Sequence, residues 1–122
     1  MVDFKITTET VEEGIVAISV KGFLDHTAAD ELQTAFKGLF SQSIYRFIVD
    51  LSELTHLGSA GIGVFISILD ILNHNKGTLV FVQSDTSKVQ QSLKMFEMST
   101  IYPVVDDRAT ALSRIKMFDS IR

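Results

Sequence analysis

The 122-residue sequence contains no cysteine, and Pro103 is its only proline. Without cysteine the chain can form neither a disulfide nor a metal site built on thiolates. An excess of basic charge is also missing, because 15 Asp and Glu residues against 11 Lys and Arg residues give a formal net charge of −4. The scattered Lys and Arg residues argue against a surface for nucleic acid or for an anionic membrane.

The hydrophobic runs of this sequence are too short to span a membrane. The longest covers residues 62–72, about half of the ~20 residues that a transmembrane helix needs, and Ser67 and Asp70 interrupt it. The first ten residues, MVDFKITTET, are polar and alternating, unlike a signal peptide. We therefore expect a soluble, cytoplasmic protein.

What is present is an alternation of short strands and helices within one domain, residues 1–122. With 46% hydrophobic and 21% charged residues, the composition is that of a globular chain. Hydrophobic periodicity predicts strands at 4–9, 14–22, 46–52, 78–83 and 102–105, and helices at 27–40, 59–75, 85–98 and 106–118. The order β-β-α-β-α-β-α-β-α predicts an α/β fold with a mostly parallel sheet and one antiparallel edge strand.

Glycine and short polar residues mark where these elements begin and end. Gly14 is typical of a hairpin turn between the first two strands. Thr27 is predicted to cap the first long helix, and Asp25 is the alternative cap if that helix begins near His26. Asp106 is predicted to cap the last helix.

The segment HLGSAGIGVFI, residues 56–66, places Ser59 among glycines just before an apolar helix. A serine hydrolase would need G-x-S-x-G and a histidine held by an acid, but Gly58 directly precedes the serine and His56 follows no triad order. The run GSAGIG also differs from G-x-G-x-x-G, and no P-loop lysine is near. Backbone N–H groups at the helix start can still attract an anion.

A metal site is disfavoured because His26, His56 and His74 do not share the i, i+4 spacing of ligands on one helix. Asp70 and His74 do have that spacing, but two residues make a poor site and an ion pair explains them better. We expect neither a metal nor a cofactor.

A structural role for Ser59 is a helix N-cap, its hydroxyl accepting from the N–H of Gly61 or Ile62. That role does not explain why Gly58, Gly61 and Gly63 crowd the helix start, where each costs roughly 0.5–1 kcal/mol relative to alanine. Close approach of another backbone or of a partner would explain it. The helix is also apolar nearly all round, so it is either clamped inside the fold or partly covered by another protein.

Three segments, in order and at the right separations, resemble the STAS domain family, the anti-sigma factor antagonists and their relatives. They are VKGFLDHTAADELQTAF at 20–36, IVDLSELTHLGSAGIGVF at 48–65 and YPVVDDRATAL at 102–112. The resemblance covers essentially the whole chain. It implies a STAS-like single domain with a four- to five-stranded mixed sheet and about four helices, in agreement with the predicted order.

The resemblance also implies a non-enzymatic role in bacterial transcription control. Unphosphorylated antagonists of this family bind an anti-sigma factor, usually a serine kinase of the histidine-kinase-like ATPase fold, and so free the sigma factor. The kinase phosphorylates the serine at the start of the second long helix, by position Ser59, and the complex dissociates; a serine phosphatase reverses this. A monomer or weak dimer is expected, with no nucleic-acid or membrane partner.

The partner surface implied by the resemblance surrounds Ser59, with Asp25 and Glu53 expected as anionic neighbours of a phosphate. The expected contact residues are Asp25, His26, Thr27, Glu53, His56, Gly58, Ser59, Ala60 and Gly61. Phe23, where the family usually has a smaller or polar residue, is either an exposed anchor on this surface or a buried side chain.

One departure from the family pattern keeps a second hypothesis open. The family commonly has Asp-Ser-Ser/Thr-Gly where this chain has Gly58-Ser59-Ala60-Gly61, so the acid before the serine and the second hydroxyl are missing. The alternative is a STAS binding or scaffold subunit of a signalling or lipid-transport assembly that works without phosphorylation.

Overall fold

A computed structural model describes residues 4–83 and 88–120 of the chain. It opens with a hairpin in which β1 (Phe4–Glu12) pairs antiparallel with β2 (Ile15–Leu24). Gly14 turns the chain with a φ of +77°, and a Cβ on it would lie 2.6 Å from the Arg46 guanidinium. The positive φ favours glycine, whereas the guanidinium is the end of a flexible side chain that could move aside, and the turn confirms the prediction.

The sheet is mixed, with six strands, and the hairpin is its only antiparallel pair within the described residues. The strands after the hairpin are β3 (Arg46–Asp50), β4 (Leu54–Leu57), β5 (Thr78–Val82) and β6 (Val104–Val105). Their order across the sheet is β1-β2-β3-β5-β6, and β4 pairs with the end of β2 beyond β3. The predicted α/β class and mixed sheet are confirmed.

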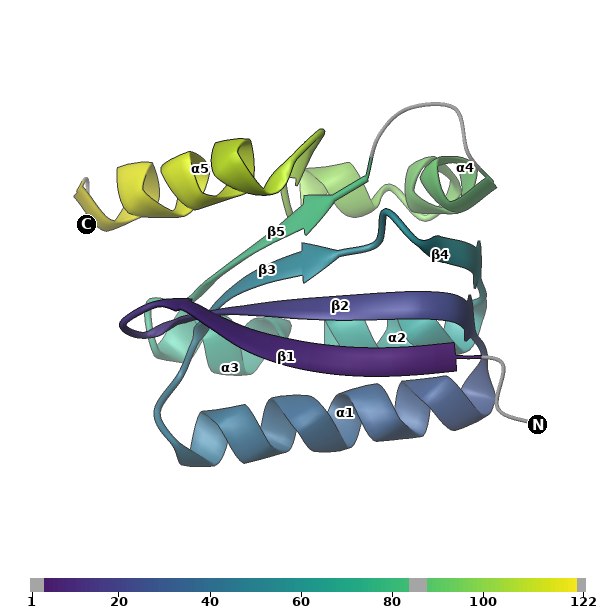
Figure 1. The fold of residues 1–122 in the computed structure, drawn as a ribbon, viewed down its shortest axis with the longest axis horizontal. Helices are drawn as coiled ribbons and strands as arrows, with labels where there is room; N and C mark the ends of the chain where they lie inside the picture. Colours follow the sequence, from purple (N-terminus) through teal and green to yellow (C-terminus); the bar gives the residue numbers. More distant parts are fainter. Residues whose placement is uncertain (1–3, 84–87, 121–122) are drawn as a thin grey trace.

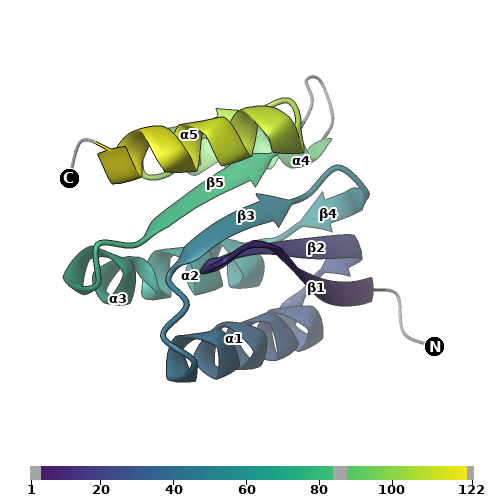
Figure 2. The ribbon, with the colours of Figure 1, turned by 60° about the vertical axis from the view of Figure 1, so that its left-hand side comes forward.

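The sheet carries helices on both faces (Figures 1 and 2). On one face lie α1 (His26–Ser41), α2 (Ser59–Ser67) and α3 (Leu69–His74), and on the other lies α5 (Arg108–Ser120). Helix α4 (Lys88–Met95) contacts β4 and is followed by a single 3₁₀ turn, η1 (Met98–Thr100). The first residues of the helix predicted at 85–98 lie outside the described residues. Within the described parts of the chain, no helix has the length and apolar character needed to cross a bilayer.

The larger core lies between the sheet and α1 to α3, where four fully buried phenylalanines meet edge to face. The ring centroids of Phe36 and Phe47 are 5.1 Å apart, and those of Phe65 and Phe81 are 4.9 Å apart. Such pairs contribute about 0.5–1.5 kcal/mol beyond the burial of their area. A smaller core under α5 contains Ile15, Ala17, Ile48, Val80, Val82, Val105, Ala111 and Ile115.

Three features differ from the predictions, besides shifts of one to three residues at the ends of other elements. The helix predicted at 59–75 is interrupted at Ile68, where the Ser67 hydroxyl donates to the Val64 carbonyl at 2.7 Å and competes with the helical ladder. The short strand β4 was not predicted, because LTHL buries only its two leucines and shows no strict alternation. Asp107, not Asp106, caps the last helix, its carboxylate accepting from the Thr110 N–H at 2.7 Å.

Candidate functional site

Two parallel strands that end side by side bring most of the expected site residues together. Leu24 at the end of β2 is in register with Leu57 at the end of β4, and the Gly58 N–H donates to the Leu24 carbonyl at 3.3 Å. Helices α1 and α2 therefore start next to each other. We call residues 25–27 and 56–61 the Ser59 edge. Of the nine expected contact residues, eight lie here.

Ser59 is the first residue of α2, and its side chain is exposed. Gly58 occupies the cap position with extended backbone, and no side chain caps the helix. The prediction that Ser59 is the N-cap is therefore wrong, and its hydroxyl makes no hydrogen bond with any residue in the described ranges. An accessible hydroxyl beside uncapped N–H groups is a geometry that tolerates a phosphate well.

The neighbouring helix is capped by Asp25. Its carboxylate accepts from the Ala28 N–H at 3.1 Å, and its carbonyl accepts from the Ala29 N–H at 2.8 Å. The predicted cap, Thr27, is wrong because α1 begins one residue before it, at His26. Asp25 remains exposed although it caps the helix, so its carboxylate can also meet a partner.

An aromatic pair stands beside these helix starts. Phe23 and His56 are in register on β2 and β4, and their ring centroids are 5.4 Å apart. Phe23 was predicted to be either exposed or buried, and with 49% of its surface accessible it is exposed. The His56 ring also lies close to Gly58, because a Cβ on that glycine would be 3.4 Å from His56 Nε2. Among the residues that the structure describes, no three His, Asp or Glu side chains are grouped to hold a metal ion.

The two glycines within α2, Gly61 and Gly63, differ in how closely they are packed. A Cβ on Gly61 would lie 2.6 Å from Leu24 Cγ and 2.9 Å from Leu57 Cδ1, so this glycine lets α2 pack directly on the ends of β2 and β4. A Cβ on Gly63 would meet nothing within 4 Å. Packing inside the chain explains Gly61 and leaves Gly63 unexplained.

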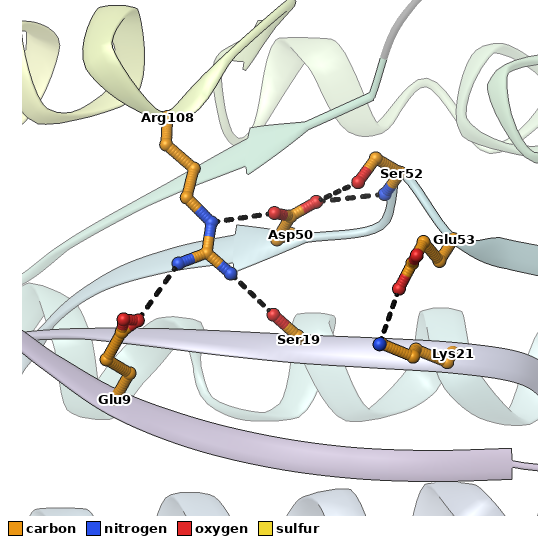
Figure 3. A network of polar contacts seen from close by, with 7 residues as sticks. All are labelled: Glu9, Ser19, Lys21, Asp50, Ser52, Glu53 and Arg108. Atoms are coloured by element: carbon orange, nitrogen blue, oxygen red, sulfur yellow. Dashed lines mark hydrogen bonds and ion pairs between the residues drawn. The ribbon is translucent and has the colours of Figure 1, made fainter.

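Glu53 lies away from Ser59, at the opposite end of β4. Its carboxylate pairs with the Lys21 ammonium at 2.7 Å (Figure 3). Its carbonyl accepts from the Gly22 N–H at 3.2 Å. Both side chains of this ion pair are about half exposed, at 48% and 61%. The expectation that Glu53 is an anionic neighbour of a phosphate on Ser59 does not fit this placement.

A second polar group, which sequence reasoning missed, is centred on Arg108 at the start of α5 (Figure 3). Arg108 donates to Asp50 at 2.7 Å and to the Ser19 hydroxyl at 2.7 Å, and it contacts the Glu9 carboxylate at 3.4 Å. Asp50 also accepts from the N–H and the hydroxyl of Ser52, at 3.0 and 2.6 Å. We call these five residues the Arg108 cluster. No local sequence pattern predicts the Arg108 cluster, because Arg108 and Glu9 are 99 positions apart.

Charge and hydrogen bonding in the Arg108 cluster shift two pKa values. Burial raises the pKa of Asp50, but the hydrogen bonds from Ser52 and Arg108 outweigh it, so the pKa of Asp50 is lowered overall. The hydrogen bond to Asp50 raises the pKa of Arg108. The cluster also borders a hollow of about 340 Å³ whose lining includes Thr7 and Lys21. These opposite charges satisfy one another and tie α5 to the sheet.

Comparison with known proteins identifies the family to which this chain belongs. The STAS domain family model matches residues 7–111, so the chain belongs to that family. Among curated relatives, the chain is similar to BtrV of Bordetella bronchiseptica, which carries the name of an anti-sigma factor antagonist. The two are 22% identical over 112 residues, which are 92% of this chain and 95% of BtrV.

Solved structures show the same fold. An anti-sigma factor antagonist from Mycobacterium paratuberculosis superposes with a TM-score of 0.81 at 20% identity, over 93% of this chain and 94% of that one. Unphosphorylated SpoIIAA, also named an anti-sigma factor antagonist, has a TM-score of 0.79 at 18% identity, over 92% and 96%. The phosphorylated form of Bacillus SpoIIAA has a TM-score of 0.69 at 17% identity, over 97% and 100%.

Proposed function

We propose that this chain is an anti-sigma factor antagonist. In its unphosphorylated form it binds an anti-sigma factor that is also a serine kinase, and phosphorylation of Ser59 releases it. The names of BtrV, of the mycobacterial protein and of SpoIIAA support the first part. The existence of SpoIIAA in unphosphorylated and phosphorylated forms supports the second. In this proposal the chain acts by binding and not by catalysis, and a phosphatase restores it.

The observation that carries the proposal is the exposed Ser59 hydroxyl, which no hydrogen bond occupies in the described structure. A modifying enzyme needs an accessible side chain, and a hydroxyl used as a cap would have to leave its helix first. Asp25, His26 and the exposed Phe23–His56 pair surround this position with one carboxylate, two imidazoles and an aromatic ring. These groups are the kind that contact a protein partner.

The physical basis of the switch lies at the interface and not in the fold. A phosphate adds roughly −1.5 to −2 charge, and at a helix N-terminus it gains about 0.3–1 kcal/mol from the dipole. The free domain therefore keeps its stability. In a fitted interface the same dianion loses its hydration without gaining an opposite charge, so a penalty of about 3 kcal/mol weakens binding more than a hundredfold.

Phosphorylation is tested by incubating the chain with its cognate anti-sigma kinase and ATP, then measuring intact mass. We expect one phosphate on the wild-type chain and none on Ser59→Ala. For binding, Ser59→Asp should bind the unmodified kinase much more weakly than wild type. Ser113→Asp, an exposed serine of α5, is the matched control and should bind like wild type. Equal affinity of Ser59→Asp and wild type would contradict the switch.

Gly58 is the specific reason to consider the alternative function, a STAS binding or scaffold subunit that works without phosphorylation. If the family's carboxylate at this position orients the serine, its absence favours a binding or scaffold subunit that is never phosphorylated. Gly58→Asp separates the two, because the space beyond the α-carbon is open enough: a Cβ would approach His56 Nε2 only to 3.4 Å. A wild-type chain that binds its partner but stays unmodified, while Gly58→Asp is phosphorylated, would identify the scaffold role.

A further inference from the structure

One edge of the sheet is formed by β1. It lies at the end of the strand order, and within the described residues β2 is the only strand that pairs with it. Figures 1 and 2 show β1 as the outer strand, with α1 running along it. From Phe4 to Thr10, seven consecutive residues pair with β2 in an unbroken register, and the bulge comes after them. Such a regular edge leaves every second N–H and C=O group pointing outward, where another strand can pair with it.

The side chains of β1 alternate between the two faces of the sheet. Glu9 contacts Arg108 on the α5 side, so the other odd-numbered residues, Lys5 and Thr7, share that face. The even-numbered residues point the other way, and Ile6 packs against the larger core on the α1 side. A strand added to this edge would therefore meet a polar, charged row on one face and a partly apolar row on the other.

Two charges on the α5 face point to the partner. Lys5 is exposed, and its ammonium makes no ion pair or hydrogen bond with any residue in the described ranges. The Glu9 side chain is 62% exposed, and its carboxylate contacts Arg108 at 3.4 Å, a long contact for an ion pair. A lone lysine in an edge strand discourages pairing with another chain. Here the same strand carries the opposite charge, at the same distance from Thr7 on its other side.

This arrangement makes β1 complementary to itself. If two copies of β1 pair antiparallel about a two-fold axis at Thr7, Lys5 of each copy lies opposite Glu9 of the other. An axis at Ile6 or at Thr8 would move Lys5 two residues away from Glu9. Of these three axes, only the one at Thr7 joins both pairs of opposite charges, and each such cross-strand pair stabilises a sheet.

The same pairing covers a hollow on the other side of the edge. It has a volume of about 370 Å³ and lies between β1 and α1, lined by Ile6, Thr8, Glu31, Thr34 and Ala35. With the axis at Thr7, Ile6 of one copy lies opposite Thr8 of the other, so the second copy places its own strand beside the hollow and covers the half-buried Ile6. The one charged side chain of the lining, Glu31, is exposed and lies on α1, off the line of pairing.

We propose that two copies of this chain associate through β1, antiparallel about Thr7, into one continuous sheet. The interface consists of one strand from each copy and the helix beside it, so it is small and the dimer is weak. This contact goes beyond the proposed function and uses none of the Ser59 edge. Because its test needs neither the kinase nor another partner, its failure would leave the proposed switch untouched.

Sedimentation equilibrium of the full chain, from micromolar to millimolar concentration, tests the association. The wild-type chain should show a reversible equilibrium between monomer and dimer. Lys5→Glu places like charges opposite each other twice and should raise the dissociation constant of the dimer at least about tenfold. Lys94→Glu is the matched control, because it makes the same change of charge at an exposed position of α4, and it should associate like wild type.

Cross-linking tests the register, and the absence of native cysteine makes single-cysteine variants unambiguous. Thr7→Cys puts two thiols directly opposite each other at a Cα separation that a disulfide can span, so mild oxidation should give a covalent dimer. Thr10→Cys, another exposed threonine of β1, is the control. In the same pairing its two thiols lie six residues apart along the strands, about 20 Å, and it should stay monomeric.

The proposal is overturned if the wild-type chain stays monomeric up to millimolar concentration, which would leave β1 unpaired or available only to a different protein. It is also overturned if Lys5→Glu associates as tightly as wild type, since the contact would then lie on another surface. Equal cross-linking of Thr10→Cys and Thr7→Cys would overturn it as well, because the strands would not share the register set by the charges.

Discussion

In the Arg108 cluster, each charged side chain has an opposite charge or a hydroxyl within hydrogen-bond distance. At the Ser59 edge, among residues 4–83 and 88–120, the serine hydroxyl has no partner and the Asp25 carboxylate bonds only to backbone. Both regions are polar, and both belong to β2 and the elements next to it. The difference indicates what each does. Polar groups that hold the fold together satisfy one another, and those at the Ser59 edge are left available to another molecule.

Breaking the Arg108 cluster should affect stability and leave partner binding intact. Arg108→Met leaves the largely buried Asp50 carboxylate without its cation, which should lower the free energy of unfolding by about 2–3 kcal/mol. Urea denaturation measures this change. Arg114→Met on the same helix is the control, because Arg114 makes no ion pair in the described structure, and it should change stability by less than about 0.5 kcal/mol.

The same cluster predicts an acid-sensitive share of the stability. The pKa of Asp50 is lower in the folded chain than in the unfolded one, so its contribution is complete above the unfolded pKa, about 4, and is lost as the pH falls through the folded value. Urea unfolding at a series of pH values from 7 to 3 should therefore show a shallower loss for Asp50→Asn than for wild type. Parallel curves would show that Asp50 does not carry this dependence.

At the Ser59 edge, the first turn of α2 contains both the exposed Ser59 and the tightly packed Gly61. Gly61→Ala should destabilise the chain by about 1–2 kcal/mol, because its Cβ would press on Leu24 and Leu57. The reduced stability would be measured by urea denaturation. A variant as stable as wild type would mean that α2 moves easily, contrary to the close packing described.

Removing the cap of α1 should have a smaller effect. Asp25→Ala loses the bond to the Ala28 N–H and should cost about 1 kcal/mol, while Thr27→Ala, which removes the hydroxyl of a residue that is not the cap, should be close to neutral. Thermal unfolding of both variants compares them directly. The reverse order would restore Thr27 as the cap.

The smallest expected effect concerns Gly63, which has open space around it where Gly61 of the same helix is tightly packed. Gly63→Ala adds a methyl group where nothing lies within 4 Å, so it should stabilise the free chain by about 0.5–1 kcal/mol. If a partner packs closely on this turn, the same change should weaken binding. Measuring both unfolding and partner affinity of this variant separates the two contributions.

The sequence predicts the layout of this protein better than its contacts. Periodicity locates the long elements, and the ends of neighbouring parallel strands explain why Asp25 and Ser59 approach each other. Sequence alone cannot choose between Asp25 and Thr27 as caps, because both residues are good caps and they are only two positions apart. It also cannot detect the Arg108–Glu9 pair, because this pair depends on how distant segments pack.

The most direct test of the central claim, that the exposed Ser59 hydroxyl controls a protein contact, compares the unmodified chain with the chain phosphorylated on Ser59. Calorimetric titration of each into the anti-sigma kinase should give dissociation constants that differ by more than about a hundredfold, with nearly unchanged melting temperatures of the free chains. Equal dissociation constants for the two forms would contradict the account.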